Sequence, residues 1–402
     1  MEKPTPHMAN DNQPSVKFDL VVIGAGPAGA AAAMAGRNAG LSVALIDKST
    51  FPRNKLCGGL VTERSRNAIR AVFKSLPARE VFHIGTLGAW HWKGEQLASF
   101  TLPDNLWFTM RYDFDNVLCQ AAISQGAIDY TGRRWKTLDQ ANNTLTMENG
   151  EVLHFGALIG ADGVTSPVAV QLFGRAFDPE TIWFALETEC ARAPDEKQTM
   201  VIDFRSTNSG YGWLFPKNHT LTVGVVGVQR ENPDMQQALM ELVPKDMVAG
   251  KVKGAFLPFG DYRKTPGKGN IVLAGDAAGL IDPLTGEGIA LALESGAFAA
   301  KAVADALAAG KPNSITKAYK RQLKPIHTDI SNAVKLRQFA FSSRFENQFR
   351  NSLQHSTGMR NMFFDLLAGK NSYHDLGRKL SPIVLAKLGK GIRNLLFRTK
   401  KP

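Results

Sequence analysis

Residues 18–29 read FDLVVIGAGPAG, and this stretch decides the fold. The run from Phe18 to Ile23 is apolar and rich in β-branched residues, which is typical of a strand buried on both faces. An alanine-rich segment follows up to Gly40, and LSVALID then ends on Asp47. We expect a strand, a helix and a second strand, with a glycine-rich first turn and an acid about twenty positions later.

The glycine turn has the spacing of a dinucleotide-binding site. Gly24 permits a tight turn, Gly26 lets a pyrophosphate approach the backbone, and Gly29 brings helix and strand together. The helix start offers free N–H groups to phosphate, and Asp47 is placed to accept hydrogen bonds from a ribose. The predicted cofactor-binding residues here also include Pro27, Ala28 and Lys48. The turn alone does not distinguish NAD from FAD.

Composition sets the class of protein. A chain of 402 residues with 44% hydrophobic and 21% charged residues is expected to fold into two or three domains. Its three cysteines cannot form a disulfide framework, which favours a reducing, cytoplasmic compartment. The eight histidines are scattered, so we predict no metal site. No apolar run approaches the roughly 18 residues that a membrane-spanning helix needs.

Much of the net charge of +12 lies at the C-terminus. Residues 371–402 hold eight Lys/Arg against one Asp, an excess of 8 − 1 = +7. Leucines and isoleucines at helical spacing, such as Leu388, Ile392 and Leu395, alternate with these cations. Such a basic amphipathic helix can lie on the anionic inner face of a membrane, or it can pack on its own protein with a solvated basic face. Because no recognised module accompanies the charge, we expect no nucleic-acid partner.

Two later stretches carry turns suited to the same cofactor. ALIGADGVTSP, residues 157–167, runs from a strand into Asp162, where the turn either approaches a second phosphate or is only a turn. NIVLAGDAAGLIDPLTGEG, residues 270–288, leads from a strand into a long helix. The start of that helix is poor in side chains and can face a group that becomes anionic, such as a reduced flavin.

In this order and at these separations, GAGPAG, ADGVTSP and GDAAGLIDPLTGEG resemble the FAD-binding fold of the aromatic-hydroxylase superfamily. Within it, FPRNKLCGG (51–59) and GYGWLFP (210–216) resemble the geranylgeranyl reductase family. The resemblance covers about residues 18–310. It implies that the ADP half of FAD lies on the glycine turn and Asp47. It implies further cofactor contacts for Arg111, Asp162, Asp276, Pro283, Gly286 and Gly288.

The resemblance also places the CGG sequence beside the flavin ring. Gly58 and Gly59 then remove bulk where a flat ring and a substrate approach the backbone. Arg53 and Lys55 are expected to hold phosphate or to favour the anionic reduced flavin. Three roles remain open for Cys57, because it can donate a proton to substrate, shape the pocket or be an inert buried thiol.

An aromatic stretch, SGYGWLFPK at 209–217, stands among alternating strands. In the resembled family such a segment borders the substrate cavity, and Tyr211 is the second candidate proton donor. The other residues assigned to the substrate pocket are Trp213, Phe215 and Pro216. Ordinary sheet core is the alternative interpretation, most of all for Phe215.

We therefore expect an α/β protein with a discontinuous Rossmann-like FAD-binding domain, an antiparallel-sheet substrate domain and a C-terminal helical segment. The expected bounds are 1–16 for a polar leader, 17–80, 106–178 and 262–330 for the FAD domain, 81–105 and 179–261 for the sheet domain, and 331–402 for the basic helical segment. No second glycine fingerprint follows residue 60, so the electron donor, NADPH or ferredoxin, is expected to bind transiently.

The implied activity is reduction of C=C bonds in an isoprenoid or similarly apolar substrate, with hydride from flavin N5. An FAD monooxygenase or a halogenase of the same superfamily is the alternative. A further alternative is an electron-transfer flavoprotein. Relatives of that kind carry an iron–sulfur cluster that needs four cysteines, so with three this chain would have to be cluster-free.

Overall fold

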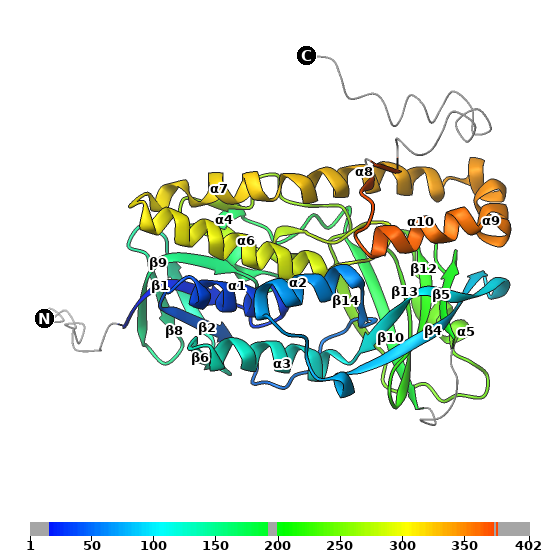
Figure 1. Ribbon diagram of the computed structural model, residues 1–402, viewed down its shortest axis with the longest axis horizontal. Coiled ribbons are helices and arrows are strands. Elements are labelled where there is room, and N and C mark those ends of the chain that lie inside the picture. The colour runs from blue at the N-terminus through cyan, green and yellow to red at the C-terminus, as the bar shows by residue number, and fades with distance from the viewer. Residues whose placement is uncertain (1–15, 192–198, 374, 377–402) are drawn as a thin grey trace, which may run out of the picture.

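The computed structural model describes residues 16–191, 199–373 and 375–376, and it has an α/β fold with two eight-stranded sheets in those ranges. One sheet lies with α1 and α3 in the blue and cyan part of the molecule, and the other lies at the opposite end (Figure 1). The chain passes between the two sheets several times, so each is built from segments that are far apart in sequence.

The first sheet contains the glycine turn. Its strands are β1 (Val16–Ile23), β2 (Val43–Asp47), β6 (Ile128–Thr131), β7 (Trp135–Asp139), β8 (Thr144–Met147), β9 (Val152–Gly160), β15 (Gly267–Lys268) and β16 (Ile271–Leu273). The order β16-β9-β1-β2-β6 is parallel throughout. Residues 43–46 of β2 and the second half of β1 are buried and apolar, as is typical of parallel strands inside a covered sheet, and β2 ends on the buried Asp47.

The second sheet is mostly antiparallel. Its strands are β3 (Leu60–Val61), β4 (Phe82–Trp92), β5 (Glu95–Thr109), β10 (Trp183–Ala191), β11 (Met200–Phe204), β12 (Tyr211–Pro216), β13 (Thr220–Val228) and β14 (Lys253–Leu257). Their order is β14-β10-β13-β12-β11-β4-β5-β3. The sheet is therefore antiparallel as expected, except for the pair β4–β11, which is parallel and joins the β4–β5 hairpin to a distant part of the chain.

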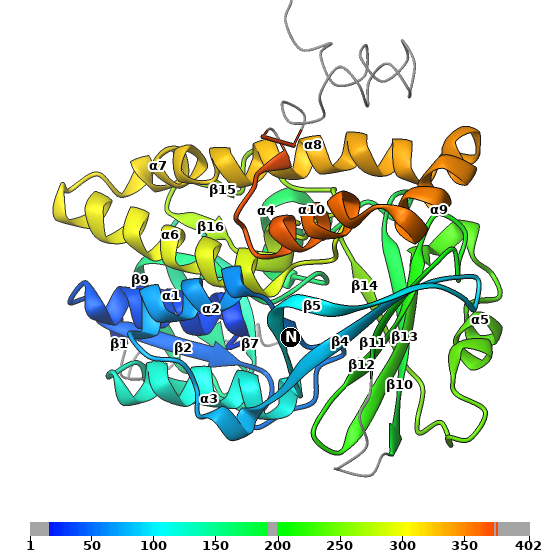
Figure 2. The same ribbon diagram turned by 45° about the vertical axis from the view of Figure 1, so that its right-hand side comes forward.

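Ten α-helices lie in the described ranges. Eight of them have four turns or fewer, and α6 and α8 are longer. They are α1 (Pro27–Asn38), α2 (Glu63–Phe73), α3 (Arg111–Ser124), α4 (Pro167–Phe173), α5 (Met235–Leu242), α6 (Ile289–Ala308), α7 (Ile315–Gln322), α8 (Lys324–Ala340), α9 (Glu346–His355) and α10 (Thr357–Leu367). Helices α7 and α8 run along one edge of the molecule, and α9 and α10 lie on the second sheet (Figure 2). Phe364 of α10 stacks on Trp90 with ring centroids 5.7 Å apart, so these helices share that sheet's aromatic core.

The expected C-terminal helical segment begins with α8, α9 and α10. Its basic amphipathic part, residues 377–402, lies outside the described residues, as does the leader at 1–15. In the ranges that are described, no helix is both long and apolar enough to cross a membrane. The bounds given above for the domains stay a prediction.

Candidate active site

The glycine turn, residues 24–29, is closed by backbone contacts that leave no room for side chains. Gly24 has φ +99°, and a Cβ there would collide with the carbonyl of Ala161. A Cβ on Gly29 would collide with the carbonyl of Gly24. Asp47 accepts the Ala25 N–H on Oδ2 and the Ser49 N–H on Oδ1, each at 2.8 Å. The acid thus fixes the turn as well as standing at the end of β2.

Two arginines share one buried carboxylate beside this turn. Arg111 holds Asp115 through Nε at 2.5 Å and Nη2 at 2.7 Å, and Arg53 Nη1 lies 3.1 Å from the same group. The Arg53 guanidinium also lies against Gly26. Burial opposes the charge on Arg111, but Asp115 outweighs burial and raises the pKa of Arg111. One carboxylate against two guanidiniums leaves an excess positive charge next to the glycine turn.

The thiol loop, residues 56–59, is tied to three strands of the second sheet. The Cys57 N–H donates to Glu187 Oε1 on β10 at 3.1 Å, and Lys217 Nζ donates to the Gly58 carbonyl. The Thr109 N–H donates to the Gly59 carbonyl at 2.9 Å. Within the loop, the Gly59 N–H donates to Cys57 Sγ at 3.3 Å. These bonds fix the direction of a thiol that is only half-buried, whereas Cys119 and Cys190 are buried.

Charged groups from distant parts of the chain surround this thiol. The Arg111 guanidinium lies within hydrogen-bonding range of Cys57 and interacts with its charge. Lys217, which is only 2% exposed, also interacts electrostatically with Cys57. Burial lowers the pKa of Lys217 and raises that of Glu187 to about 7, although the charge of Lys217 acts against the Glu187 shift. The site can therefore change its charge near neutral pH.

An aromatic strand and the loop at 282–288 form the other side of the site. Tyr211, Trp213 and Phe215 alternate along β12 and share one face. Trp213 and Phe215 press on the thiol loop at Gly58, and the Tyr211 hydroxyl lies against Gly286, which has φ +73°. Burial, together with the charges of Asp282 and Cys57, raises the pKa of Tyr211, so its hydroxyl keeps its proton. The Tyr211 hydroxyl thus lies on the loop at 282–288, and the loop that carries Cys57 packs on the same aromatic strand.

Comparisons with known proteins agree with this geometry. A family model described as tryptophan halogenase matches residues 109–367, and one described as FAD dependent oxidoreductase matches residues 19–83. A menaquinone reductase of Mycobacterium tuberculosis is 30% identical over 322 residues, which cover 70% of this chain and 76% of that protein. A geranylgeranyl diphosphate reductase of Rhodobacter capsulatus is 26% identical and covers 93% of this chain and 96% of that protein.

The chain belongs to a family of FAD-dependent oxidoreductases that includes this menaquinone reductase, and the proteins similar to it include reductases of geranylgeranyl groups. A crystal structure of a geranylgeranyl bacteriochlorophyll reductase-like protein from Thermoplasma acidophilum has the same fold, with a TM-score of 0.74 at 19% identity. That alignment covers 91% of this chain and 99% of the other. The family, the fold and the FAD-dependent oxidoreductase class predicted from the sequence are therefore confirmed.

The residues present fit the FAD that this family uses. Helix α1 begins at Gly26 without a side-chain cap, directly after a turn that no Cβ can enter, and Arg53 lies beside it. Helix α6 begins at Gly288, also without a side-chain cap. Such helix starts suit phosphate and other anionic groups. The first would hold the pyrophosphate and the second would face the ring, which is the arrangement expected from the sequence.

The other predicted cofactor residues differ in their surroundings: Asp276 and Asp162 are buried among other groups, and Lys48 is exposed. Asp276 lies near Lys55 and Arg111, whose charges partly offset the rise that burial gives its pKa. Asp162 accepts the Val168 N–H at 3.2 Å and so supports the start of α4, while burial raises its pKa to about 6. Lys48 is exposed at the end of β2. The cofactor contacts of all these residues stay a prediction.

Arg64, although close to Cys57 in sequence, makes its contacts with α6. Arg64 forms a bidentate pair with Glu294 on α6, with both bonds at 2.7 Å. Trp213 and Phe215 are only 6% and 8% exposed beneath the thiol loop. A part in lining the substrate cavity stays a prediction for both. In the described ranges, no three His, Cys, Asp or Glu side chains are grouped as a metal ion would require.

Sequence reasoning missed three residues of this site. Asp115 stands four positions after Arg111, a spacing that pairs side chains on a helix and was available as a signal. Lys217 ends the aromatic stretch, and an apolar strand context made its burial hard to foresee. Glu187 alternates with apolar neighbours along β10, and only the thiol loop packed against that strand explains why a carboxyl is buried there.

Proposed function

We propose that the enzyme reduces C=C bonds of an isoprenoid or similarly apolar substrate. The observation that carries this proposal is that the loop of Cys57 packs at Gly58 on the aromatic strand, whose Tyr211 hydroxyl lies against Gly286. The aromatic strand behind them gives the site apolar walls suited to a hydrocarbon. The names of the similar reductases from M. tuberculosis and R. capsulatus support the same reaction class.

When bound, FAD supplies a hydride from N5. An isolated alkene accepts hydride poorly, so a proton must reach the neighbouring carbon as the hydride arrives. Cys57 Sγ and Tyr211 Oη are the candidate donors. Of the two, only the thiol has cations beside it, because Arg111 and Lys217 lie close enough to interact with it electrostatically. Burial and the nearby Asp282 carboxylate oppose ionisation of Tyr211, which favours a part in orienting the substrate.

The electron donor and the partners belong to the same proposal. NADPH or ferredoxin would reduce the flavin in a transient encounter. The substrate would be an apolar small molecule or a lipid, and the basic segment at 377–402 would contact a membrane surface. We propose no role for nucleic acid.

Anaerobic stopped-flow tests the reaction. Reduced enzyme is mixed with geranylgeranyl diphosphate in the absence of O₂, and flavin absorbance is followed. Reoxidation together with a product heavier by two hydrogens is expected. If the flavin stays reduced until O₂ is admitted, the reductase proposal is wrong and a monooxygenase or halogenase takes its place. Reoxidation by a quinone but not by the alkene indicates an electron carrier.

The thiol is tested in the same assay. Cys57→Ser should retain FAD yet slow alkene reduction by about 100-fold or more, the usual effect of losing a positioned proton donor. Cys190→Ala, which changes a buried cysteine of the second sheet, is the matched control and should react at the normal rate. Equal rates for Cys57→Ser and Cys190→Ala would remove Cys57 from the mechanism.

The halogenase alternative has one specific observation in its favour. The family model described as tryptophan halogenase covers residues 109–367, which include the aromatic strand and the loop at 282–288. A halogenase needs O₂ and halide and forms a product containing the halogen. Turnover with both present, and none without O₂, would support this candidate over the reductase.

A further inference from the structure

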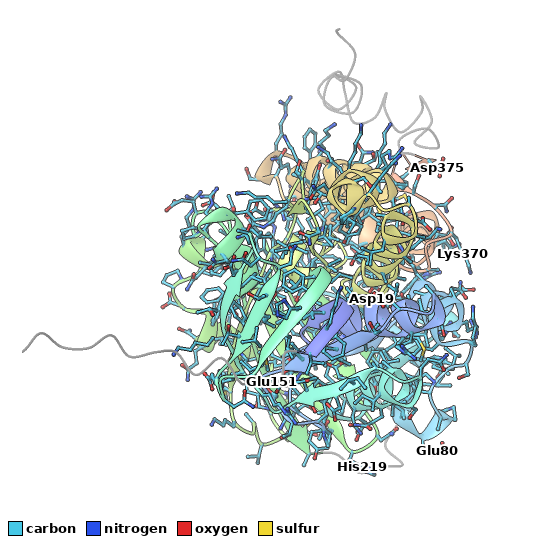
Figure 3. The ribbon with its side chains drawn as sticks, turned by 90° about the vertical axis from the view of Figure 1, so that its left-hand side faces the viewer. Asp19, Glu80, Glu151, His219, Lys370 and Asp375 are labelled. Carbon is cyan, nitrogen blue, oxygen red and sulfur yellow. The ribbon has the colours of Figure 1, made fainter. Side chains whose placement is uncertain are left out.

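A stripe of positive charge, distinct from the active site, runs along α7 and into α8. Lys317, Lys320 and Arg321 are spaced i, i+3 and i+4 on α7 and so share one helical face, and Lys324 at the start of α8 lines the same hollow. All four are exposed. In the view of Figure 3, nitrogen-tipped side chains project from the end of the molecule where the yellow helices lie.

These four cations repel one another without compensation from the described part of the chain. None of them forms an ion pair with a carboxylate there. Lys320 and Arg321 complement the negative end of the α7 dipole, which explains two of them. Lys324 is the first residue of α8, where the dipole disfavours a cation, and Lys317 is not in the last turn of α7. A local conflict of this kind is typical of a functional surface.

The stripe borders a cavity of about 330 Å³. Tyr262 and His327 form an aromatic wall, with ring centroids 4.4 Å apart, and the Tyr262 hydroxyl lies 2.8 Å from Ser331 Oγ. Burial and the charge of Lys320 lower the pKa of His327 to about 4, so this ring is neutral at neutral pH. No Asp or Glu lines the cavity. Its volume is at the low end of the range for ligand pockets, which suits a small group or a headgroup.

The wall of this cavity lies directly behind the loop that carries Asp276. Gly279 packs so closely on Tyr262 that a Cβ on Gly279 would collide with the backbone of Asp261 and Tyr262. The Arg263 N–H also donates to the carbonyl of Ala278 at 3.0 Å. A ligand seated against Tyr262 would therefore be separated from a predicted cofactor loop by one backbone segment, residues 261–263.

We propose that this cavity binds the phosphate group of a small molecule or of a lipid headgroup. Lys and Arg side chains are the common partners of phosphate, and a multiply charged anion removes the repulsion among four of them at once. Thr328 and Ser331 add hydroxyl groups to the lining. The site differs from the active site in position and in chemistry, so it does not depend on the proposed reaction.

Calorimetry on the FAD-loaded enzyme tests the site with inorganic diphosphate as the probe. A Lys317→Gln/Arg321→Gln variant removes two exposed cations of the stripe. The matched control, Lys245→Gln/Lys251→Gln, removes two exposed cations between α5 and β14. We expect saturable binding by the wild type and the control, and at least tenfold weaker binding by the stripe variant. The same three proteins are then sedimented with phosphatidylcholine vesicles, with and without phosphatidylglycerol.

The two arms identify the source of the phosphate. Diphosphate binding that depends on the stripe indicates a small phosphorylated ligand. Binding only to vesicles that contain phosphatidylglycerol, lost in the stripe variant and kept in the control, indicates a lipid headgroup. The proposal is overturned if diphosphate does not saturate and the two double variants sediment alike, because general charge attraction then explains all binding.

Discussion

The glycine turn and the thiol loop serve one site but are held in different ways. The turn is closed mainly by backbone, from its own strand–helix–strand unit and from Ala161, and Asp47 adds a side-chain hydrogen bond. The thiol loop is held mainly by side chains and strands far away in sequence, above all Glu187 and Lys217. The turn therefore depends on glycines, which have no side chain, whereas the thiol loop depends on the side chains of distant residues.

This contrast indicates how each region can change. A backbone-built turn accepts almost no substitution, so the same pattern serves many dinucleotide-binding proteins. A loop held by side chains can be retuned by changing one partner on a distant strand. Asp115 connects the two regions, because its arginines reach Gly26 on one side and Cys57 on the other.

The largest effect should come from breaking the turn alone. In Gly29→Val the new side chain collides with the Gly24 carbonyl, which is backbone and cannot move aside. We expect no FAD in the purified protein, measured by its absorbance, and a loss of at least about 3 kcal/mol in unfolding free energy. Gly358→Ala, on a helix with no close backbone neighbour, is the control and should bind FAD normally. A yellow Gly29→Val protein would contradict the backbone argument.

The next largest effect should come from removing the group that the two regions share. Asp115→Ala leaves Arg53 and Arg111 without their counter-ion, with side chains only 17% and 10% exposed. Removing one partner of a buried ion pair costs about 3–5 kcal/mol, which urea unfolding would measure. Asp113→Ala, an exposed position on the same helix, should change stability by less than about 0.5 kcal/mol. Similar losses in both variants would mean that the arginines are solvated rather than paired.

The difference between the regions also explains what the sequence could predict. The turn, its flanking strands and Asp47 lie within 30 consecutive residues, so a contiguous pattern was enough to predict them. The same holds for the loop at 275–288. The partners of the thiol loop are separated from it by 130 and 159 positions. A buried glutamate and a buried lysine break the usual pattern of strands, and without the fold nothing in a single sequence pairs them with Cys57.

The fold shows the same limit. Parallel strands that are apolar throughout and a glycine turn identify the first sheet. The parallel pairing of β4 with β11 depends on which distant strand the β4–β5 hairpin meets, and no local residue encodes that choice.

The cations near Cys57 illustrate the same limit of prediction from sequence. The sequence placed Arg53 and Lys55 next to Cys57, whereas the cations that interact with the thiol include Arg111 and Lys217, which are far away in sequence.

A pH series should isolate the thiol loop. The pKa of Glu187 rises from 4.5 to about 7 on folding because of burial, so the folded state binds this proton more tightly. Stability from this group is therefore present at low pH and falls as pH rises from about 4.5 to about 7, by about 3 kcal/mol in all. Glu187→Gln keeps an oxygen for the Cys57 N–H but removes the titration.

The measurement compares urea unfolding of Glu187→Gln and wild type at pH 5 and pH 8. We expect the variant to gain stability relative to wild type between the two values. Asp162, with a pKa of about 6, is present in both proteins and cancels in the comparison. Parallel stability curves would mean that Glu187 is hydrated and titrates normally.

The smallest effect should come from the contact between the Tyr211 hydroxyl and Gly286. Gly286→Ala adds a methyl group that collides with this hydroxyl, and it also forces alanine into φ +73°. Tyr211→Phe removes the collision but not the backbone strain, so the double variant should recover about 1 kcal/mol in a double-mutant cycle. Gly310→Ala, at φ +64° with open space around it, measures the strain alone. If Gly286→Ala costs no more than Gly310→Ala, with or without Tyr211→Phe, the loop and the aromatic strand do not touch, and the second proton donor lies away from the loop at 282–288.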